Sequence, residues 1–172
     1  MEYRDSGEMV KYQEVRGVIT GIDYFYEEDG TTRQGHYFVQ VLDQENPSTF
    51  YITNDTFYVD CDLGVGDYVF GYYRADRPMI LIYPPRYDIE VVGKVRDGRN
   101  VKVDRFNDEL VSADGMLKLN ISEMTWIANN MGKIYCDNIA NKNLLVIYGA
   151  STRSIPAITV PSVIIVLPDH ET

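Results

Sequence analysis

Apolar residues in this chain come in short runs, and each run is bounded by Gly, Pro, Asn or Asp. Runs of this kind, rich in Val, Ile and Tyr, are typical of β-strands separated by tight turns. The longest apolar stretch, residues 160–167, is interrupted by Pro161 and Ser162. It is far too short to cross a hydrocarbon core of about 30 Å. We therefore expect an all-β protein of many short strands, with no membrane-spanning segment.

The first half of the chain predicts strands joined by recognisable turns. A long first strand over residues 15–26 contains Gly17 and Gly21, which permit a bend or a bulge. Asp29-Gly30 predicts the tight turn of a hairpin. The further strands expected in this half cover residues 37–41, 50–53, 68–73, 79–83 and 87–95.

The second half predicts a similar order of elements. Residues 122–130 have the clearest helix character, with Ser122 as a cap, and residues 54–63 allow one short helical turn at the corresponding place. The strands expected in this half cover residues 101–106, 116–121, 144–148 and 163–167.

Matches between the two halves indicate an internal repeat. A shift of 75 residues places Tyr73 on Tyr148, and a shift of 76 places Ile89 on Ile165. One insertion near residues 127–133 reconciles the two shifts. The alternative explanation is chance, because strand residues match one another easily. The matches keep the same order of elements, which favours the repeat.

Each half therefore predicts five strands with a helix or loop between the third and the fourth, which is the order of the OB-fold. We expect two tandem OB-like five-stranded barrels, an acidic and Tyr-rich one over residues 1–90 and a neutral one over residues 91–172. The strand over residues 87–95 would end the first barrel and begin the second. A single β-sandwich is the alternative, because such folds also show many short strands.

Three segments carry a resemblance to a known group of proteins. They are Gly-Asp-Tyr-Val-Phe-Gly-Tyr-Tyr at residues 66–73, Ile-Tyr-Pro-Pro at residues 82–85 and Tyr-Gly-Ala-Ser-Thr-Arg-Ser-Ile-Pro-Ala at residues 148–157. They resemble segments of small uncharacterised OB-like β-barrel proteins from clostridial-type Gram-positive bacteria. The resemblance covers most of the second unit and half of the first, and it implies the fold without an activity.

The charge of the chain is unevenly distributed. The chain has 26 acidic and 16 basic side chains, a net charge of -10. All of this excess lies in residues 1–90, which also hold 12 of the 14 tyrosines, whereas residues 91–172 sum to zero. An acidic surface disfavours a phosphate-rich ligand on the first unit. Five basic residues within residues 94–105 leave single-stranded nucleic acid as an alternative for the second unit.

Few side chains have the pattern that catalysis or metal binding needs. The chain has two histidines, His36 and His170, and it has no Gly-x-Ser-x-Gly elbow and no phosphate-binding glycine loop. Three aspartates within residues 60–67 fail the calcium-loop pattern, because Gly64 and Val65 stand where a third oxygen ligand and a glycine are required. We therefore expect a protein that is not an enzyme and uses no metal or cofactor.

Cysteine usage and the start of the chain indicate the compartment. Cys61 and Cys136 are too few for a disulfide framework or a cysteine metal site, so we expect two reduced and mostly buried thiols. Residues 1–18 are polar and charged, unlike a signal peptide. The expected location is the cytoplasm.

The two loops that follow the fourth strands are candidate ligand-binding loops. In the OB-fold, the loop between strands four and five flanks the ligand face. Charged and hydroxyl side chains there are suited to an anion or a sugar. The structural alternative is that Arg74 pairs with Asp76 and that the hydroxyl groups close turns. The candidate residues are Arg74, Asp76, Arg77, Ser151, Thr152, Arg153 and Ser154.

Tyrosines supply a second candidate surface. Tyr68, Phe70 and Tyr72 alternate onto one face of their strand. Such a face is suited to stacking on sugars or bases, and it also suits a small core with hydroxyl groups at its rim. We include Tyr68 and Tyr72 among the candidate ligand-binding residues.

These observations predict a binding or interaction protein that engages a protein partner. One alternative is a carbohydrate or small-anion binder that uses the tyrosine face and the two loops. A second alternative is single-stranded nucleic acid binding through the second unit. A protein partner predicts an exposed apolar or aromatic patch, and a sugar predicts a groove with an exposed tyrosine floor.

Overall fold

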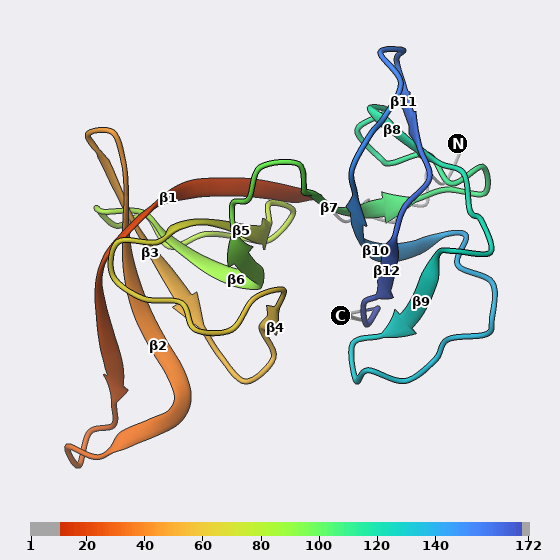
Figure 1. Cartoon of the computed structure of the whole chain (residues 1–172). Coiled ribbons are helices and arrows are strands. Elements are labelled where there is room, and N and C mark those ends of the chain that lie inside the picture. The colour runs from red at the N-terminus through yellow and green to blue at the C-terminus, as the bar shows by residue number, and fades with distance from the viewer. Residues whose placement is uncertain (1–10, 170–172) are drawn as a thin grey trace, which may run out of the picture. The chain divides into compact units, whose positions relative to one another are not determined.

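The computed structural model describes residues 11–169, and these residues form strands, turns and loops (Figure 1). The all-β expectation is therefore confirmed. The described residues divide into two compact units, residues 12–95 and residues 96–169, which we call the N-terminal and C-terminal units. Within the described residues there is no helix that has the length and apolar character to cross a membrane.

The N-terminal unit is a six-stranded sheet in the order β3-β2-β1-β5-β6-β4. Neighbouring strands are antiparallel except at β4–β6, and an additional parallel pairing joins β3 to β6. That pairing closes a circuit of five strands, β1-β2-β3-β6-β5. Each of the five strands is therefore paired on both of its edges over at least part of its length. The strands are β1 (Tyr12–Tyr26), β2 (Thr32–Asp43), β3 (Asn46–Ile52), β4 (Phe57–Tyr58), β5 (Tyr68–Arg74) and β6 (Arg86–Lys94).

The long first strand bends as the sequence predicts (Figure 1). Its pairing with β2 shifts register between Ile19 and Gly21 and again between Tyr24 and Tyr26. Gly17 lies against β2 so closely that an added Cβ would come within 2.9 Å of the carbonyl oxygen of Leu42. Glycine is therefore required at position 17 for β1 to approach β2.

A compact apolar core fills the N-terminal unit. Its centre is Phe50, which is completely buried and packs with other buried side chains from β1, β2, β5 and β6. Alternation along each strand places one set of side chains inside and the other outside. The buried members are Ile19, Val39, Val41, Phe50, Ile52, Val69, Ile89 and Val92.

The C-terminal unit is built from a four-stranded sheet in the order β7-β10-β12-β9 and a two-stranded sheet of β8 and β11. β12 runs antiparallel to β10 and parallel to β9, and β8 runs parallel to β11. The core centres on Phe106 and Leu144, both completely buried. The strands are β7 (Asn100–Phe106), β8 (Leu117–Leu119), β9 (Trp126–Asn129), β10 (Lys142–Tyr148), β11 (Ala157–Thr159) and β12 (Val163–Val166).

A hydroxyl-closed turn precedes β4 in the N-terminal unit. The hydroxyl of Thr56 accepts a hydrogen bond from the backbone N–H of Thr53 at 3.0 Å. The same hydroxyl donates to the carbonyl oxygen of Ile89 at 2.7 Å. The turn is thereby tied to β6, and it replaces the helical turn that the sequence predicts over residues 54–63.

The same turn precedes β9 in the C-terminal unit. The hydroxyl of Thr125 accepts from the N–H of Ser122 at 3.2 Å and donates to the carbonyl oxygen of Pro161 at 2.7 Å. The helix predicted over residues 122–130 is therefore wrong. Ser122 does not cap a helix, because the turn closes after four residues and Trp126 then pairs with β12.

Two further strand predictions are corrected by the structure. Residues 79–83 lie in the loop between β5 and β6, because Pro78, Pro84 and Pro85 flank them and cannot donate ladder hydrogen bonds. The strand expected to be shared by two barrels is also wrong. β6 pairs with strands of the N-terminal unit only among the described residues, and a turn at Gly98, whose φ is 74°, separates it from β7.

The expectation that both cysteines are buried is wrong. Cys61 and Cys136 are exposed and free. Cys61 follows β4 and Cys136 follows β9, in segments where the chain has left the sheets and no longer contributes to either core.

Candidate functional site

The loop between β5 and β6 exposes a continuous apolar segment. The five consecutive side chains of residues 79–83 are all exposed, and the most exposed are Leu81 at 99% and Tyr83 at 82%. We call these five residues the apolar loop; they are Met79, Ile80, Leu81, Ile82 and Tyr83. Soluble proteins rarely expose contiguous apolar surface of this kind unless it has a partner.

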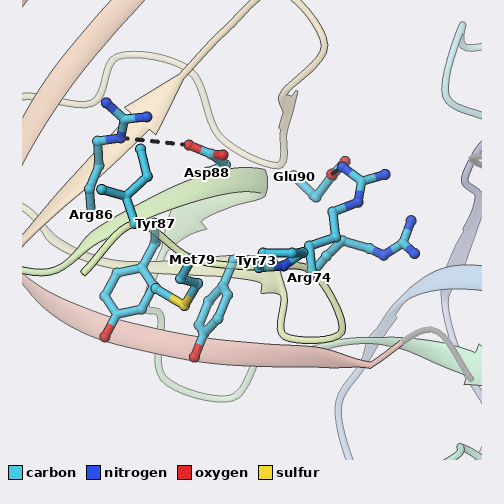
Figure 2. A pocket seen from close by; sticks show the side chains of 10 residues that line it. Tyr73, Arg74, Met79, Arg86, Tyr87, Asp88 and Glu90 are labelled. Atoms are coloured by element: carbon cyan, nitrogen blue, oxygen red, sulfur yellow. Dashed lines mark ion pairs between the residues drawn. The ribbon is translucent and has the colours of Figure 1, made fainter. Parts of the chain in front are cut away.

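A small groove of 70 Å³ lies at the base of the apolar loop (Figure 2). β5, the loop and β6 all contribute to its lining. Met79 and Ile80 bring apolar surface from the loop, and Tyr73 and Tyr87 bring it from the two strands. The groove therefore continues the apolar loop onto the body of the unit.

The floor of the groove is aromatic. The rings of Tyr73 and Tyr87 lie side by side with their centroids 4.5 Å apart, and Met79 lies next to them in Figure 2. The hydroxyl of Tyr73 donates to Oε1 of Gln13 on β1 at 3.0 Å. Burial raises the pKa of Tyr73, with Tyr87 adding to the effect, so its hydroxyl remains a donor at neutral pH.

A buried ion pair forms one wall of the groove. Nε and Nη2 of Arg74 donate to the two carboxylate oxygens of Asp76 at 3.0 and 2.6 Å. The hydrogen bonds of Asp76 raise the pKa of Arg74, so the guanidinium stays charged. Arg74 is only 8% exposed, and its Nη1 is buried without a hydrogen-bond partner among the described residues. An acceptor from outside the unit reaches this nitrogen only if the side chains around it move aside.

Two looser ion pairs line the rim. Nη1 of Arg77 is 3.6 Å from Oε1 of Glu90, and Nε of Arg86 is 3.9 Å from Oδ1 of Asp88. Exposed pairs at such distances contribute about 0–1 kcal/mol, so they can exchange partners at little cost. The rim therefore combines two cations with two carboxylates.

Tyr12 lies behind this wall. It pairs with Arg74 in the β1–β5 register. Burial raises the pKa of its hydroxyl, and the negative charge of Glu90 raises it further. The hydroxyl therefore stays protonated and adds no charge to the ion pair of Arg74 and Asp76.

The two tyrosines predicted to bind a ligand, Tyr68 and Tyr72, differ in exposure. Tyr68 is exposed at the start of β5. Tyr72 is 5% exposed and packs edge-on against Phe70, with ring centroids 6.0 Å apart. Tyr72 therefore presents little surface to a ligand, and the aromatic floor of the groove comes from Tyr73, its neighbour on the opposite face of β5.

The predicted loop residues fall into two groups. Arg74 and Arg77 line the groove in the N-terminal unit, and Asp76 pairs with Arg74, the pairing given as the structural alternative. The other four lie in the C-terminal unit, in the loop between β10 and β11, and all four are exposed. They are Ser151, Thr152, Arg153 and Ser154.

Hydroxyl groups close the C-terminal loop on itself. Thr152 and Ser154 share a hydrogen bond of 2.6 Å between their hydroxyl oxygens. Ser154 donates to the carbonyl oxygen of Pro156 at 2.8 Å, and the Thr152 hydroxyl accepts from the N–H of Ile158 at 2.8 Å. These bonds occupy the hydroxyl groups of Thr152 and Ser154, while the neighbouring Ile155 is 81% exposed.

A second aromatic cluster, on β1, β2 and β3, was not found from the sequence. Phe38 stacks on Tyr51 with centroids 5.0 Å apart and on Phe25 at 5.8 Å. The guanidinium carbons of Arg86 and Arg33 lie 5.3 Å from the Tyr51 centroid and 4.7 Å from the Phe25 centroid. Cross-strand pairing creates the cluster, so no linear motif marks it.

Candidate catalytic and metal groups are sparse in the described residues. His36 Nδ1 lies 3.0 Å from the hydroxyl of Tyr51, and His170 lies outside the described residues. Across residues 11–169, no group of three or more His, Cys, Asp or Glu side chains is placed to hold a metal ion.

The basic segment of residues 94–105 is largely neutralised by local carboxylates. Lys102 pairs with Asp114, and Nη1 of Arg105 lies 3.6 Å from Oδ1 of Asp169. Both pairs lie within the C-terminal unit. Paired cations of this kind offer a weaker attraction to phosphates than a row of free ones.

Comparisons with known proteins give no further guide to the site. No protein-family model, no curated protein and no solved structure matches the chain. The function is therefore inferred from the site alone.

Proposed function

We propose that this protein is a non-enzymatic binding module that engages a protein partner through the apolar loop and the groove beside it. The observation that carries the proposal is the exposure of the five consecutive side chains of residues 79–83. Burying such side chains gains about 25 cal/mol per Å² of apolar surface. A partner protein with a complementary apolar surface would obtain that gain.

The groove supports a peptide segment as the element that is bound. Its aromatic floor suits an apolar side chain, because Tyr73 and Tyr87 combine apolar surface with polar tips. The buried and unpartnered Nη1 of Arg74 suits a backbone carbonyl or a carboxylate of the partner once the side chains around it move aside. An apolar peptide with an acceptor next to its anchor residue therefore matches both features.

The charge of the unit favours a protein over a membrane as the partner. Residues 12–95 carry 14 acidic and 6 basic side chains, a net charge of −8. Anionic lipid surfaces attract basic segments and would repel this unit. The two rim arginines, Arg77 and Arg86, provide only local positive charge beside the loop.

We further propose that each unit is OB-like and that the two arose from one repeated unit. The closed five-strand circuit of the N-terminal unit, with its parallel β3–β6 pairing, supports the first part. The hydroxyl-closed turns before β4 and β9 support the second, because each threonine hydroxyl accepts from the N–H three residues earlier and donates to a backbone carbonyl more than 30 residues later. On this view the apolar loop is the loop between OB strands four and five, which flanks the ligand face.

The proposal is tested by selecting peptides from a random display library on the immobilised full chain. Selected peptides are then measured by titration against wild type and Leu81→Asp. Binding to Leu81→Asp would remove a charged carboxylate from water. We therefore expect Leu81→Asp to bind these peptides with at least about tenfold lower affinity than wild type. Because Leu81 is 99% exposed, the substitution should leave folding unchanged within about 0.5 kcal/mol.

Val65→Asp is the matched control, since Val65 is also an exposed apolar residue of the N-terminal unit but lies in a different loop. It should bind the selected peptides like wild type. The absence of any enriched peptide, or equal binding by Leu81→Asp and wild type, would contradict the proposal. Sedimentation of wild type with anionic lipid vesicles, lost in Leu81→Asp, would show that the loop inserts into membranes instead.

A carbohydrate ligand is a second candidate, favoured by the aromatic cluster of Phe25, Phe38 and Tyr51. Flat aromatic surface with flanking guanidinium groups is suited to the apolar face and hydroxyl groups of a sugar. An oligosaccharide array should then give binding that Tyr51→Ala removes and Leu81→Asp retains. An array without any bound sugar would eliminate this candidate.

A further inference from the structure

The core of the N-terminal unit contains a cavity that no part of the proposed protein-binding site uses. Its volume is 160 Å³. The groove at the apolar loop and this cavity share no lining residue. The cavity therefore needs an explanation of its own.

The walls of the cavity are apolar and already buried. They come from all parts of the five-strand circuit, so their positions are fixed by the packing of the core. An apolar cavity of about 150 Å³ is large enough to accept benzene. The buried apolar residues that line the cavity are Ile19, Val39, Phe50, Ile52, Val69 and Val92.

The mouth of the cavity is polar on one side. Ile22 and Tyr58 line it and are half exposed, and Tyr37 and Asp62 also contribute. Burial raises the pKa of Tyr58, with Tyr37 and then Cys61 adding to the effect, so the phenol stays neutral. An apolar chamber thus opens toward two phenol rings and one carboxylate.

Asp62 differs from its two neighbouring aspartates. Asp60 accepts a hydrogen bond from the N–H of Lys94 at 2.8 Å, and Asp67 accepts one from the N–H of Gly64 at 2.8 Å. Asp62 makes no hydrogen bond or ion pair with the described residues, and its backbone is left-handed, with a φ of 61°. Its carboxylate is therefore uncommitted at the mouth.

We propose that this cavity binds a single-ring aromatic molecule that carries an ammonium group. The ring occupies the apolar chamber, whose size matches one six-membered ring. The ammonium group lies at the mouth, where the carboxylate of Asp62 pairs with it and the faces of Tyr37 and Tyr58 attract it. The site is a small-molecule site within the unit that we propose binds protein, and it does not depend on that proposal.

Benzylamine and toluene test the two parts of this site, because they share a ring and differ in the ammonium group. Each is titrated into the full chain while backbone amide chemical shifts are recorded by NMR. We expect saturable shifts at amides of β2, β3 and β5 with both molecules. Asp62→Asn should lower the affinity for benzylamine by at least about fivefold and leave the affinity for toluene unchanged. Asn suits the left-handed backbone at this position, so the fold should be retained.

Three variants serve as controls. Asp43→Asn removes an exposed carboxylate outside the cavity and should leave both affinities unchanged. Ile22→Trp enlarges a half-exposed residue at the mouth and should weaken both molecules. Leu81→Asp should affect neither, which separates this site from the apolar loop.

Two outcomes would overturn the inference. If neither molecule gives saturable shifts at the cavity, the chamber does not take a ring. If both bind and Asp62→Asn changes benzylamine no more than Asp43→Asn does, the mouth does not recognise an ammonium group, and the proposed ligand class is wrong.

Discussion

The two units differ in how their edge strands are paired. In the N-terminal unit the seven-residue β3 pairs with both β2 and β6, and the circuit closes. In the C-terminal unit the three-residue β8 pairs with β11 instead, and β9 takes the parallel place beside β12. The circuit closes in the unit with the seven-residue β3, and the three-residue β8 takes part in no such circuit.

The loops that follow β5 and β10 also differ between the units. The N-terminal loop exposes five apolar side chains beside a groove, whereas hydroxyl groups close the C-terminal loop on itself. The surrounding charge differs too, with −8 for residues 12–95 and zero for residues 96–169. We therefore expect a protein partner to bind to the N-terminal unit. The following substitutions test how far the two units differ.

The largest expected loss of stability comes from removing one buried aromatic ring from each core. Phe50→Ala and Phe106→Ala each remove a completely buried ring, which should cost about 3–5 kcal/mol of unfolding free energy. Because the two rings belong to separate clusters, each variant should lose amide protection mainly in its own unit. Segment-resolved hydrogen exchange measures this. Equal loss of protection in β3 and β10 in either variant would show that the units share one core.

The next effect compares two glycines. Gly17→Ala brings a Cβ within 2.9 Å of the Leu42 carbonyl oxygen, which should destabilise the N-terminal unit by about 1–3 kcal/mol. Gly149→Ala meets its nearest atom, the carbonyl oxygen of Gly98, at 3.7 Å and should change stability by less than about 0.5 kcal/mol. Urea midpoints provide the measurement. A Gly17→Ala midpoint equal to that of wild type would show that β1 and β2 are not held this closely.

A smaller effect tests the two hydroxyl-closed turns. Thr56→Val leaves the N–H of Thr53 and the carbonyl of Ile89 without their partner, which should cost about 1–2 kcal/mol. Thr125→Val removes the same contacts in the C-terminal unit, but Thr125 is less deeply buried, so water can replace part of them and the cost should be smaller. Urea unfolding of the two variants checks the order. A larger loss in Thr125→Val would reverse the expected comparison.

The smallest effect concerns a buried carboxylate of the C-terminal unit. Burial raises the pKa of Asp104, and hydrogen bonds from the N–H groups of Arg105 and Asp114 oppose the shift only in part. The folded state therefore holds this proton more tightly than the unfolded state does. This contribution to stability is present below the ordinary aspartate pKa of about 4 and is lost as pH rises through the raised folded value.

Asp104→Asn cannot titrate, so its stability relative to wild type should increase as pH rises through that interval. Asp97→Asn, an exposed aspartate of the same unit, is the control and should follow wild type. Thermal unfolding from pH 3 to pH 7 gives the comparison. If Asp104→Asn and wild type show parallel pH profiles, Asp104 does not carry the proposed proton.

Local patterns in the sequence predicted the elements that depend on local chemistry. The bent first strand follows from Gly17 and Gly21, and the hairpin follows from Asp29-Gly30, where Gly30 has a φ of 84°. Arg74 and Arg77 were singled out because they follow an apolar strand, and both line the groove.

Features that depend on distant pairing could not be predicted in this way. Residues 79–83 have strand composition, but flanking prolines and the absence of a partner strand leave them as a loop. The pairing of β8 with β11 joins segments about 40 residues apart, which no local pattern specifies. The cavity at Asp62 arises only when five strands close around it.

We propose that the apolar loop of the N-terminal unit binds a protein partner and that the loop between β10 and β11 does not. Leu81 and Ile155 are the most exposed apolar residues of the loop after β5 and the loop after β10, at 99% and 81%. Titration of a library-selected peptide against Leu81→Asp and Ile155→Asp tests the claim most directly. The account predicts at least about a tenfold loss of affinity for Leu81→Asp and a change below about twofold for Ile155→Asp. Equal losses in both variants, or a loss only in Ile155→Asp, would contradict it.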